Sequence, residues 1–257
     1  MLEFDRGMPN HTDRFTILDV AKQVAGQMVP VNSNISFFST TPIVEEDLKQ
    51  YVQEPVAALP PAVGEMLPHI GLLLVPHLER GTGRSPAMVS FEPPTAGRSL
   101  LTAEVTVDDQ LLIALATSDV DMSEYHYTLY DAIAAQITSR APVSFIEDFA
   151  SLLREELAAE ANGEIREESW ELKQKYLHRA SANGKRESVL WSNYRRRALR
   201  DTLTLFLHGI CCDIDVEAGP RQLASRYIRK RLELLKSTFP PPEGYSLFPE
   251  QVRRRKG

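Results

Sequence analysis

The chain has little cysteine, no long apolar run and no low-complexity tract. Its two cysteines, Cys211 and Cys212, are adjacent, so no disulfide framework is available, which fits a reducing compartment. The longest apolar run, residues 111–116, is far shorter than the roughly 20 residues that a membrane-spanning helix needs. The first residues also lack the basic start and apolar stretch of a secretory signal. We therefore expect a soluble protein of the cytoplasm with no membrane partner.

The sequence also lacks the spacing of any catalytic or phosphate-binding signature. His126, His208 and Asp201 are weak catalytic candidates, because a histidine beside a tyrosine or a carboxylate can transfer protons. His208 and Cys212 lie four residues apart, but a structural zinc site needs four ligands and no second pair has suitable spacing. We therefore expect no metal site and no cofactor, and a protein that binds rather than catalyses. An enzyme with a histidine-based site is the least favoured alternative.

Charge is present in abundance and is unevenly distributed. Residues 1–172 contain 10 Lys and Arg against 27 Asp and Glu, whereas residues 173–257 contain 19 against 8. The net charge of −6 therefore conceals balances of −17 and +11. Such asymmetry can mark a surface for nucleic acid or another anionic partner. The opposite interpretation, given even weight, is that acidic and basic residues neutralise each other within the fold or across a dimer.

Hydrophobic patterning predicts an α+β fold. Residues 35–38, 70–75 and 87–92 have strand character, and alternating residues 101–107 turn at Asp108-Asp109 into residues 111–116, which predicts a hairpin. We expect a small antiparallel sheet of three or four strands, flanked by helices and without crossover connections, followed by an all-helical region. The Ala141-Pro142 break suggests three parts: an acidic α+β region over 1–141, a helical region over 142–239 that is basic in its second half, and an extended, Pro-rich basic tail over 240–257.

Local signals predict where several helices begin and end. Thr16 with Asp19 and Ser144 with Glu147 have capping-box spacing, and Asp121 precedes Glu124 in the same way. Thr41-Pro42 has the hydroxyl and proline typical of a helix start. Asn162-Gly163 is typical of a helix end.

The longest predicted helix, from about 187 to 213, carries apolar residues on both flanks and should be central in a core. Its cysteines should then be small buried hydrophobes. Arginines around Trp191 and Tyr194 and a basic arc on the following helix could bind anions or nucleic acid, with the aromatic rings stacking on bases. The candidate binding residues are Arg195, Arg196, Arg200, Arg226, Arg229 and Lys230.

Two function classes compete with catalysis. The first hypothesis is a non-catalytic protein-interaction, regulatory or assembly protein that uses its helical C-terminal region to dock a protein partner or a second copy of itself. The alternative is binding of RNA or single-stranded DNA through the basic helices. The sequence pI of about 5.6 counts against the alternative, because dedicated nucleic-acid domains usually exceed about 9.

Overall fold

The computed structural model describes residues 14–83, 85–180, 189–212 and 221–247. The chain divides into two compact units. The sheet unit comprises Met1–Val56 and Pro68–Leu129, and the helical unit comprises Ala57–Leu67 and Tyr130–Gly257. By sequence the sheet unit has 7 Lys and Arg against 16 Asp and Glu, a balance of −9, so the helical unit carries +3. The acidic excess therefore belongs to the sheet unit.

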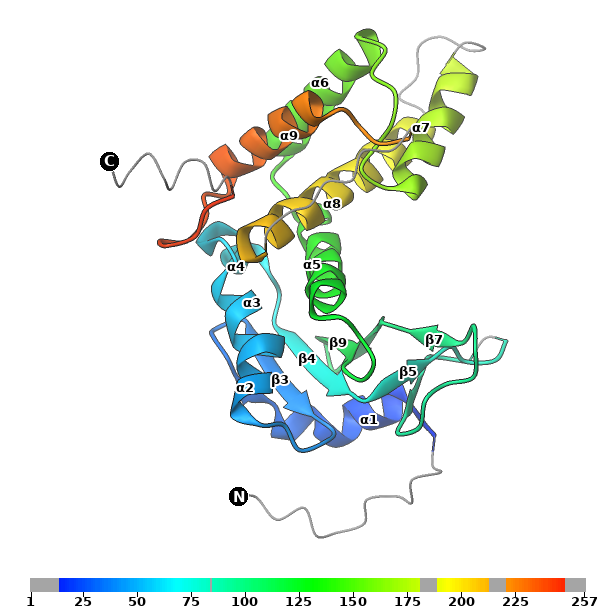
Figure 1. Ribbon diagram of the computed structural model, residues 1–257, viewed down its shortest axis with the longest axis vertical. Helices are drawn as coiled ribbons and strands as arrows, with labels where there is room; N and C mark the ends of the chain where they lie inside the picture. Colours follow the sequence, from blue (N-terminus) through cyan, green and yellow to red (C-terminus); the bar gives the residue numbers. More distant parts are fainter. Residues whose placement is uncertain (1–13, 84, 181–188, 213–220, 248–257) are drawn as a thin grey trace. The chain divides into compact units, whose positions relative to one another are not determined.

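The α+β class is confirmed, and the main sheet has five strands. They run in the order β2 (Val29–Pro30), β3 (Ile35–Ser39), β4 (Ile70–Val75), β9 (Gln110–Ala116) and β8 (Thr102–Val107). Figure 1 labels the three central strands, β3, β4 and β9. The expected hairpin is β8 and β9, turning through Asp108 and Asp109 with φ of 48° and 64°, the left-handed pair of a type I′ turn.

Two pairings in this sheet correct the expectation of an antiparallel arrangement without crossovers. Strand β4 pairs in parallel with both β3 and β9. The chain crosses from β3 to β4 through α2 (Glu45–Leu48), the π-helical turn η2 (Lys49–Gln53), α3 (Glu54–Ala57) and α4 (Pro61–Met66). The reason is burial, because every residue of β4 is buried and parallel strands covered on both faces are typically continuous apolar runs.

One face of the sheet is covered by α1 (Ile17–Val24). Its buried Ile17, Val20 and Val24 form one apolar cluster with Leu73 of β4 and Ala114 of β9. A second, four-stranded antiparallel sheet has the order β1 (Phe15–Thr16), β6 (Met88–Ser90), β5 (His77–Glu79) and β7 (Ser99–Leu100).

Two predicted caps of the sheet unit are confirmed and one is wrong. Thr16 accepts a hydrogen bond from the Asp19 amide at 3.2 Å, and Asp121 accepts one from the Ser123 amide at 2.8 Å at the start of α5 (Met122–Thr138). No helix begins at Thr41-Pro42, since α2 begins at Glu45 after Val44.

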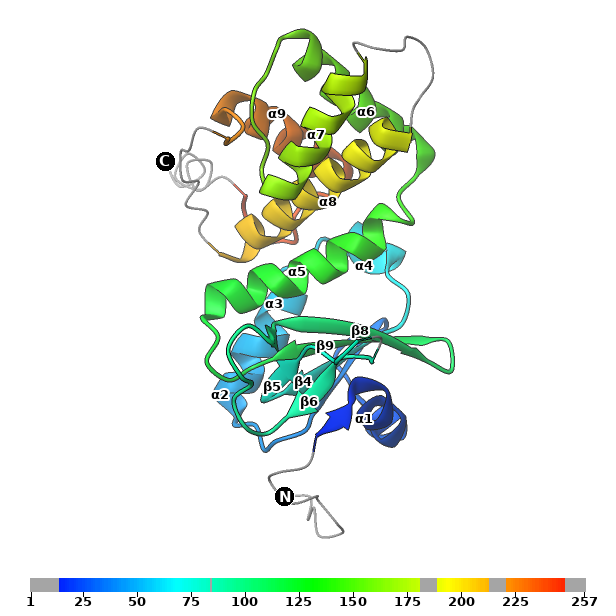
Figure 2. The ribbon, with the colours of Figure 1, turned by 90° about the vertical axis from the view of Figure 1, so that its right-hand side faces the viewer.

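The helical unit contains α4, the part of α5 from Tyr130, α6 (Val143–Ala158), α7 (Glu167–Ala180), α8 (Val189–Cys211) and α9 (Ser225–Thr238) (Figure 2). Helix α8 is buried on two flanks, as its pattern predicts, and α7 packs along it. None of the described helices is long and apolar enough to cross a membrane. Of the predicted tail, residues 240–247 form no helix or strand, and the basic residues 253–256 lie outside the described residues.

Helix α6 corrects two capping predictions. It begins at Val143 after Pro142 without a side-chain cap, so the Ser144–Glu147 box does not form. It ends at Ala158 rather than at Asn162-Gly163. Gly163, with φ of +86°, lies instead where the chain passes close to residues 221–222.

A charged network holds the helices of this unit together from inside. Arg231 of α9 is 0% exposed and forms hydrogen bonds of 2.5–3.0 Å to both carboxylate oxygens of Glu156 and of Glu164. Tyr194 donates to Glu164 at 2.5 Å, and Lys173 donates to the carbonyls of Ala161 and Gly163. Burial alone would raise the pKa of Glu164, but the Arg231 and Lys173 cations hold it below its usual value. Two cations and two carboxylates thus neutralise one another in the buried interior of the unit.

Candidate functional site

One face of α8 lines an arginine-rich pocket. Asn193, Arg196, Arg197 and Arg200 recur at helical spacing and therefore project from the same side of the helix. Ala135 and Thr138 at the end of α5, Ser139 just after it and Leu172 of α7 complete its lining, and its volume is about 460 Å³. We call this pocket the arginine groove. It combines three guanidinium groups, two hydroxyls and an amide with two apolar contacts, a lining suited to an anionic group attached to an apolar body.

Two of the three arginines are already held by carboxylates. Arg200 binds both oxygens of Asp131, at 3.0 and 2.7 Å, and Arg166 shares that carboxylate at 3.2 Å. Arg197 lies 2.9 Å from Asp201 and 3.4 Å from Glu168. Three cations thus meet three carboxylates, so these arginines are fixed in position rather than available as unpaired charge.

The available positive charge comes from two other arginines. Arg196 is exposed, and among the described residues no carboxylate pairs with it. Arg140, just beyond α5, is also exposed, and within the described residues it donates to neutral oxygens only, those of Gln136 and the Ser139 hydroxyl. Arg196 lines the groove and Arg140 donates to the lining residue Ser139, and neither cation has a carboxylate partner within the described chain.

The aromatic side chains near these arginines are not available for base stacking. Trp191 is 3% and Tyr194 0% exposed, and both pack against Tyr176, with ring centroids 5.3 and 6.5 Å apart. The Arg221 guanidinium covers the ring of Trp170 at 4.5 Å. A nucleobase would have to displace protein contacts to reach any of these rings.

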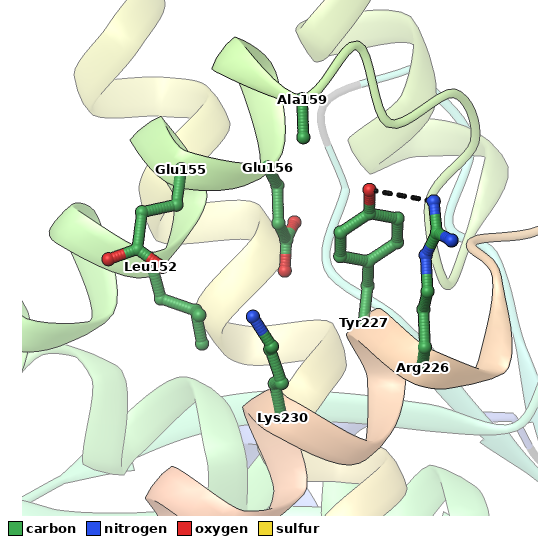
Figure 3. A pocket seen from close by; sticks show the side chains of 7 residues that line it. All are labelled: Leu152, Glu155, Glu156, Ala159, Arg226, Tyr227 and Lys230. Atoms are coloured by element: carbon green, nitrogen blue, oxygen red, sulfur yellow. Dashed lines mark hydrogen bonds between the residues drawn. The ribbon is translucent and has the colours of Figure 1, made fainter.

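The other predicted binding residues lie on α9, where Arg226, Arg229 and Lys230 are all exposed. Arg226 stacks on Tyr227 at 4.7 Å and donates to its hydroxyl at 3.1 Å. Arg226 and Lys230 line a second pocket, of about 240 Å³, between α9 and α6 (Figure 3). The six predicted residues are therefore distributed as Arg196 and Arg200 at the groove, Arg226 and Lys230 at the second pocket, and Arg195 and Arg229 at neither.

The histidines proposed as catalytic candidates are packed among aromatic side chains. His126 is 5% exposed, with Nε2 2.9 Å from the Gln50 carbonyl and its ring beside Tyr125. His208 is 8% exposed, with its ring edge-on to Tyr130 at 6.4 Å. Neither residue lines the arginine groove or the α6–α9 pocket. The cysteines near His208 are half-buried rather than fully buried as expected, because α8 ends there.

Asp201, the third catalytic candidate, does not line the groove but contacts its Arg197. Its side chain is 0% exposed, and burial raises the pKa of its carboxyl, an effect that the Arg197 guanidinium only partly offsets. Asp201 therefore orients one groove arginine while its own ionised form is disfavoured by burial.

Replacing Asp201 by asparagine should change how stability depends on pH. Above the ordinary aspartate pKa, folded Asp201 retains a proton that the unfolded chain releases, so this residue's contribution to stability falls as pH rises through its raised pKa. Asparagine cannot titrate. The unfolding free energy of Asp201→Asn minus that of the wild type should therefore increase with pH in the range above about 4 and then level off. Urea unfolding at a series of pH values measures this difference, and a difference that does not change with pH would contradict the prediction.

Sequence reasoning identified the basic face of α8 but missed the groove's other wall. Thr138 and Ser139, at the end of α5 and just after it, belong to that wall, and no sequence signal links this segment to α8. Arg140, which donates to Ser139, was missed for the same reason. The arginine face itself was visible as residues spaced three and four apart. Compared with family models, with curated proteins and with solved structures, the chain matches none of them.

Proposed function

We propose that this protein is a non-catalytic interaction or assembly protein whose helical unit binds an acidic segment of a protein partner in the arginine groove. The observation that carries the proposal is exposed Arg196 in a pocket whose other arginines are fixed by Asp131, Asp201 and Glu168. A second exposed cation, Arg140, donates to the lining residue Ser139. Carboxylates of a partner would find guanidinium donors there, and Leu172 would contact its apolar atoms.

A protein partner is favoured over RNA or single-stranded DNA for two reasons. The rings that would stack on bases are buried or covered by arginine. Four arginines after residue 172 also pair with acidic residues that precede it, namely Arg197, Arg200, Arg221 and Arg231. These four charges are already engaged and would contribute less to holding a phosphate backbone, on which non-specific nucleic-acid affinity depends.

Reversing the charge of Arg196 should abolish binding of an acidic peptide. A fluorescein-labelled octaglutamate peptide is titrated with the full chain at low and physiological salt, and fluorescence anisotropy is recorded. We expect binding that weakens as salt rises, and a loss of at least about tenfold in Arg196→Glu, because a carboxylate would then face the peptide's own. Arg140→Glu should act in the same direction.

Arg229→Glu is the matched control, since it makes the same charge change at an exposed position of α9 outside both pockets. Its affinity should stay within about twofold of the wild type. An oligouridine titrated in parallel separates the two classes of partner. Tighter binding of oligouridine than of octaglutamate, lost in Arg196→Glu, would replace this proposal by the nucleic-acid one. Equal losses of octaglutamate affinity in Arg196→Glu and Arg229→Glu would show that the peptide does not bind specifically in the arginine groove.

A further inference from the structure

The second pocket, between α6 and α9, has a lining of a different character from that of the arginine groove. Its walls are Leu152 and Ala159 of α6 and the ring of Tyr227 of α9, and charged side chains stand around them (Figure 3). With about 240 Å³ it lies below the range of about 300–1,000 Å³ typical of drug-sized ligands. Its occupant should therefore be a small molecule with an apolar part.

The carboxylate at the base of this pocket is already neutralised. Glu156 is 1% exposed, and Arg231 binds both of its oxygens, at 2.9 and 2.5 Å. Glu156 belongs to the buried network with Glu164 and Lys173, in which positive and negative charges are equal in number. A ligand in the pocket would thus meet no net charge from below, and its recognition would fall to the side chains at the rim.

Three charged side chains at the rim lack an ion-pair partner within the described part of the chain. They are Glu155 on α6 and Arg226 and Lys230 on α9, all exposed. Figure 3 shows the Lys230 ammonium reaching into the space between the two helices, and the Arg226 guanidinium lying beside Tyr227, to whose hydroxyl it donates. Although charges of both signs line one pocket, no ion pair joins Glu155 to Lys230 or Arg226 among the described residues.

We propose that this pocket binds a small zwitterion of the α-amino-acid class with an apolar side chain. Lys230 and Arg226 receive the ligand's carboxylate, Glu155 receives its ammonium, and Leu152, Ala159 and Tyr227 contact the side chain. A simple anion would leave Glu155 unpaired beside it, and a simple cation would face Lys230 and Arg226. Only a ligand with both charges satisfies all three groups. The site is independent of the arginine groove, so neither proposal depends on the other.

Isothermal titration calorimetry of the full chain with leucine tests this site. 4-Methylpentanoate lacks the ammonium group of leucine and isoamylamine lacks its carboxylate, so the three probes separate the two charges. We expect leucine to bind at least about tenfold more tightly than either analogue, since each lost charged hydrogen bond reduces affinity by roughly that factor. Equal or tighter binding of either analogue, or no heat from leucine at millimolar concentration, would overturn the proposal.

Two variants assign the charges to residues. Lys230→Met should weaken leucine at least about tenfold, whereas Arg229→Met, the neighbouring exposed cation outside the pocket, should leave its affinity unchanged. Glu155→Gln should weaken leucine but not 4-methylpentanoate, because it removes only the partner of the ammonium group. Equal effects of Glu155→Gln on both ligands would also overturn the assignment. Far-ultraviolet circular dichroism of each variant verifies that the helices remain folded.

Discussion

Replacing Arg231 by methionine should destabilise the helical unit by about 3–5 kcal/mol, the usual loss when one partner of a buried ion pair is removed. Methionine replaces the aliphatic part of the arginine side chain but supplies none of the four hydrogen bonds that Arg231 donates to Glu156 and Glu164. Two carboxylates would then remain in the interior with Lys173 as the cation nearest to Glu164. Both tryptophans, Trp170 and Trp191, belong to the helical unit, so urea unfolding followed by their fluorescence reports on this unit specifically.

Arg229→Met is the control, because Arg229 lies two positions earlier on α9 and is exposed; it should change the unfolding free energy by less than about 0.5 kcal/mol. The double variant Glu156→Gln, Arg231→Met removes one carboxylate together with its cation and leaves Glu164 paired with Lys173, so it should be more stable than Arg231→Met alone. A loss below about 1 kcal/mol in the single variant, or no recovery in the double variant, would show that the network does not hold the unit together.

The same variant has an expected dependence on pH. In the wild type, the lowered pKa of Glu164 means that its stabilising contribution is present above the ordinary glutamate range and is lost as pH falls through the lowered value. In Arg231→Met the buried carboxylates gain stability by taking up protons as pH falls. The difference in unfolding free energy between the wild type and the variant should therefore shrink between about pH 7 and pH 4.

The features that sequence predicted correctly depend on neighbouring residues. The Thr16 cap needs only Asp19, three positions away, and the β8–β9 hairpin needs only the two aspartates at its turn. The parallel pairing of β4 could not be deduced in that way, because β3 and β9 lie far from β4 in sequence. Its one local signal was the unbroken apolar run of residues 70–75, which fits a strand buried on both faces better than an antiparallel strand with one wet face.

The buried network shows the same limit for charged residues. Arg231 lies four positions after Tyr227 and four before Leu235, so the helical pattern places it on the apolar arc of α9. That position was a signal, but only the fold brings Glu156 and Glu164 to the same point from α6 and from the connection to α7. The arginine groove divides likewise: the face of α8 follows from spacing, and Arg140 beside it follows only from how α5 meets α8.

Replacing Gly163 by alanine should destabilise the helical unit by about 3 kcal/mol or more, since it combines backbone strain with a clash. Gly163 has φ of +86°, and a Cβ atom there would lie 2.4 Å from the Gln222 carbonyl oxygen and 2.7 Å from that of Arg221. Both are backbone atoms, so no side chain can rotate away. The two segments are joined by hydrogen bonds from the Glu164 amide to Arg221 and from the Leu223 amide to Glu164.

Separating those segments would also displace Glu164, whose carboxylate binds Arg231, Tyr194 and Lys173. Gly244→Ala is the matched control, because Gly244 has φ of +87° in the same unit but open space around its Cβ position. The unfolding free energy of Gly244→Ala should fall by only about 1–2 kcal/mol, which is the cost of placing alanine in the left-handed conformation. Tryptophan fluorescence in urea distinguishes the two: an excess loss in Gly163→Ala, up to failure to fold, locates the close approach at this glycine, whereas equal losses would mean that the two segments can separate without disturbing the network.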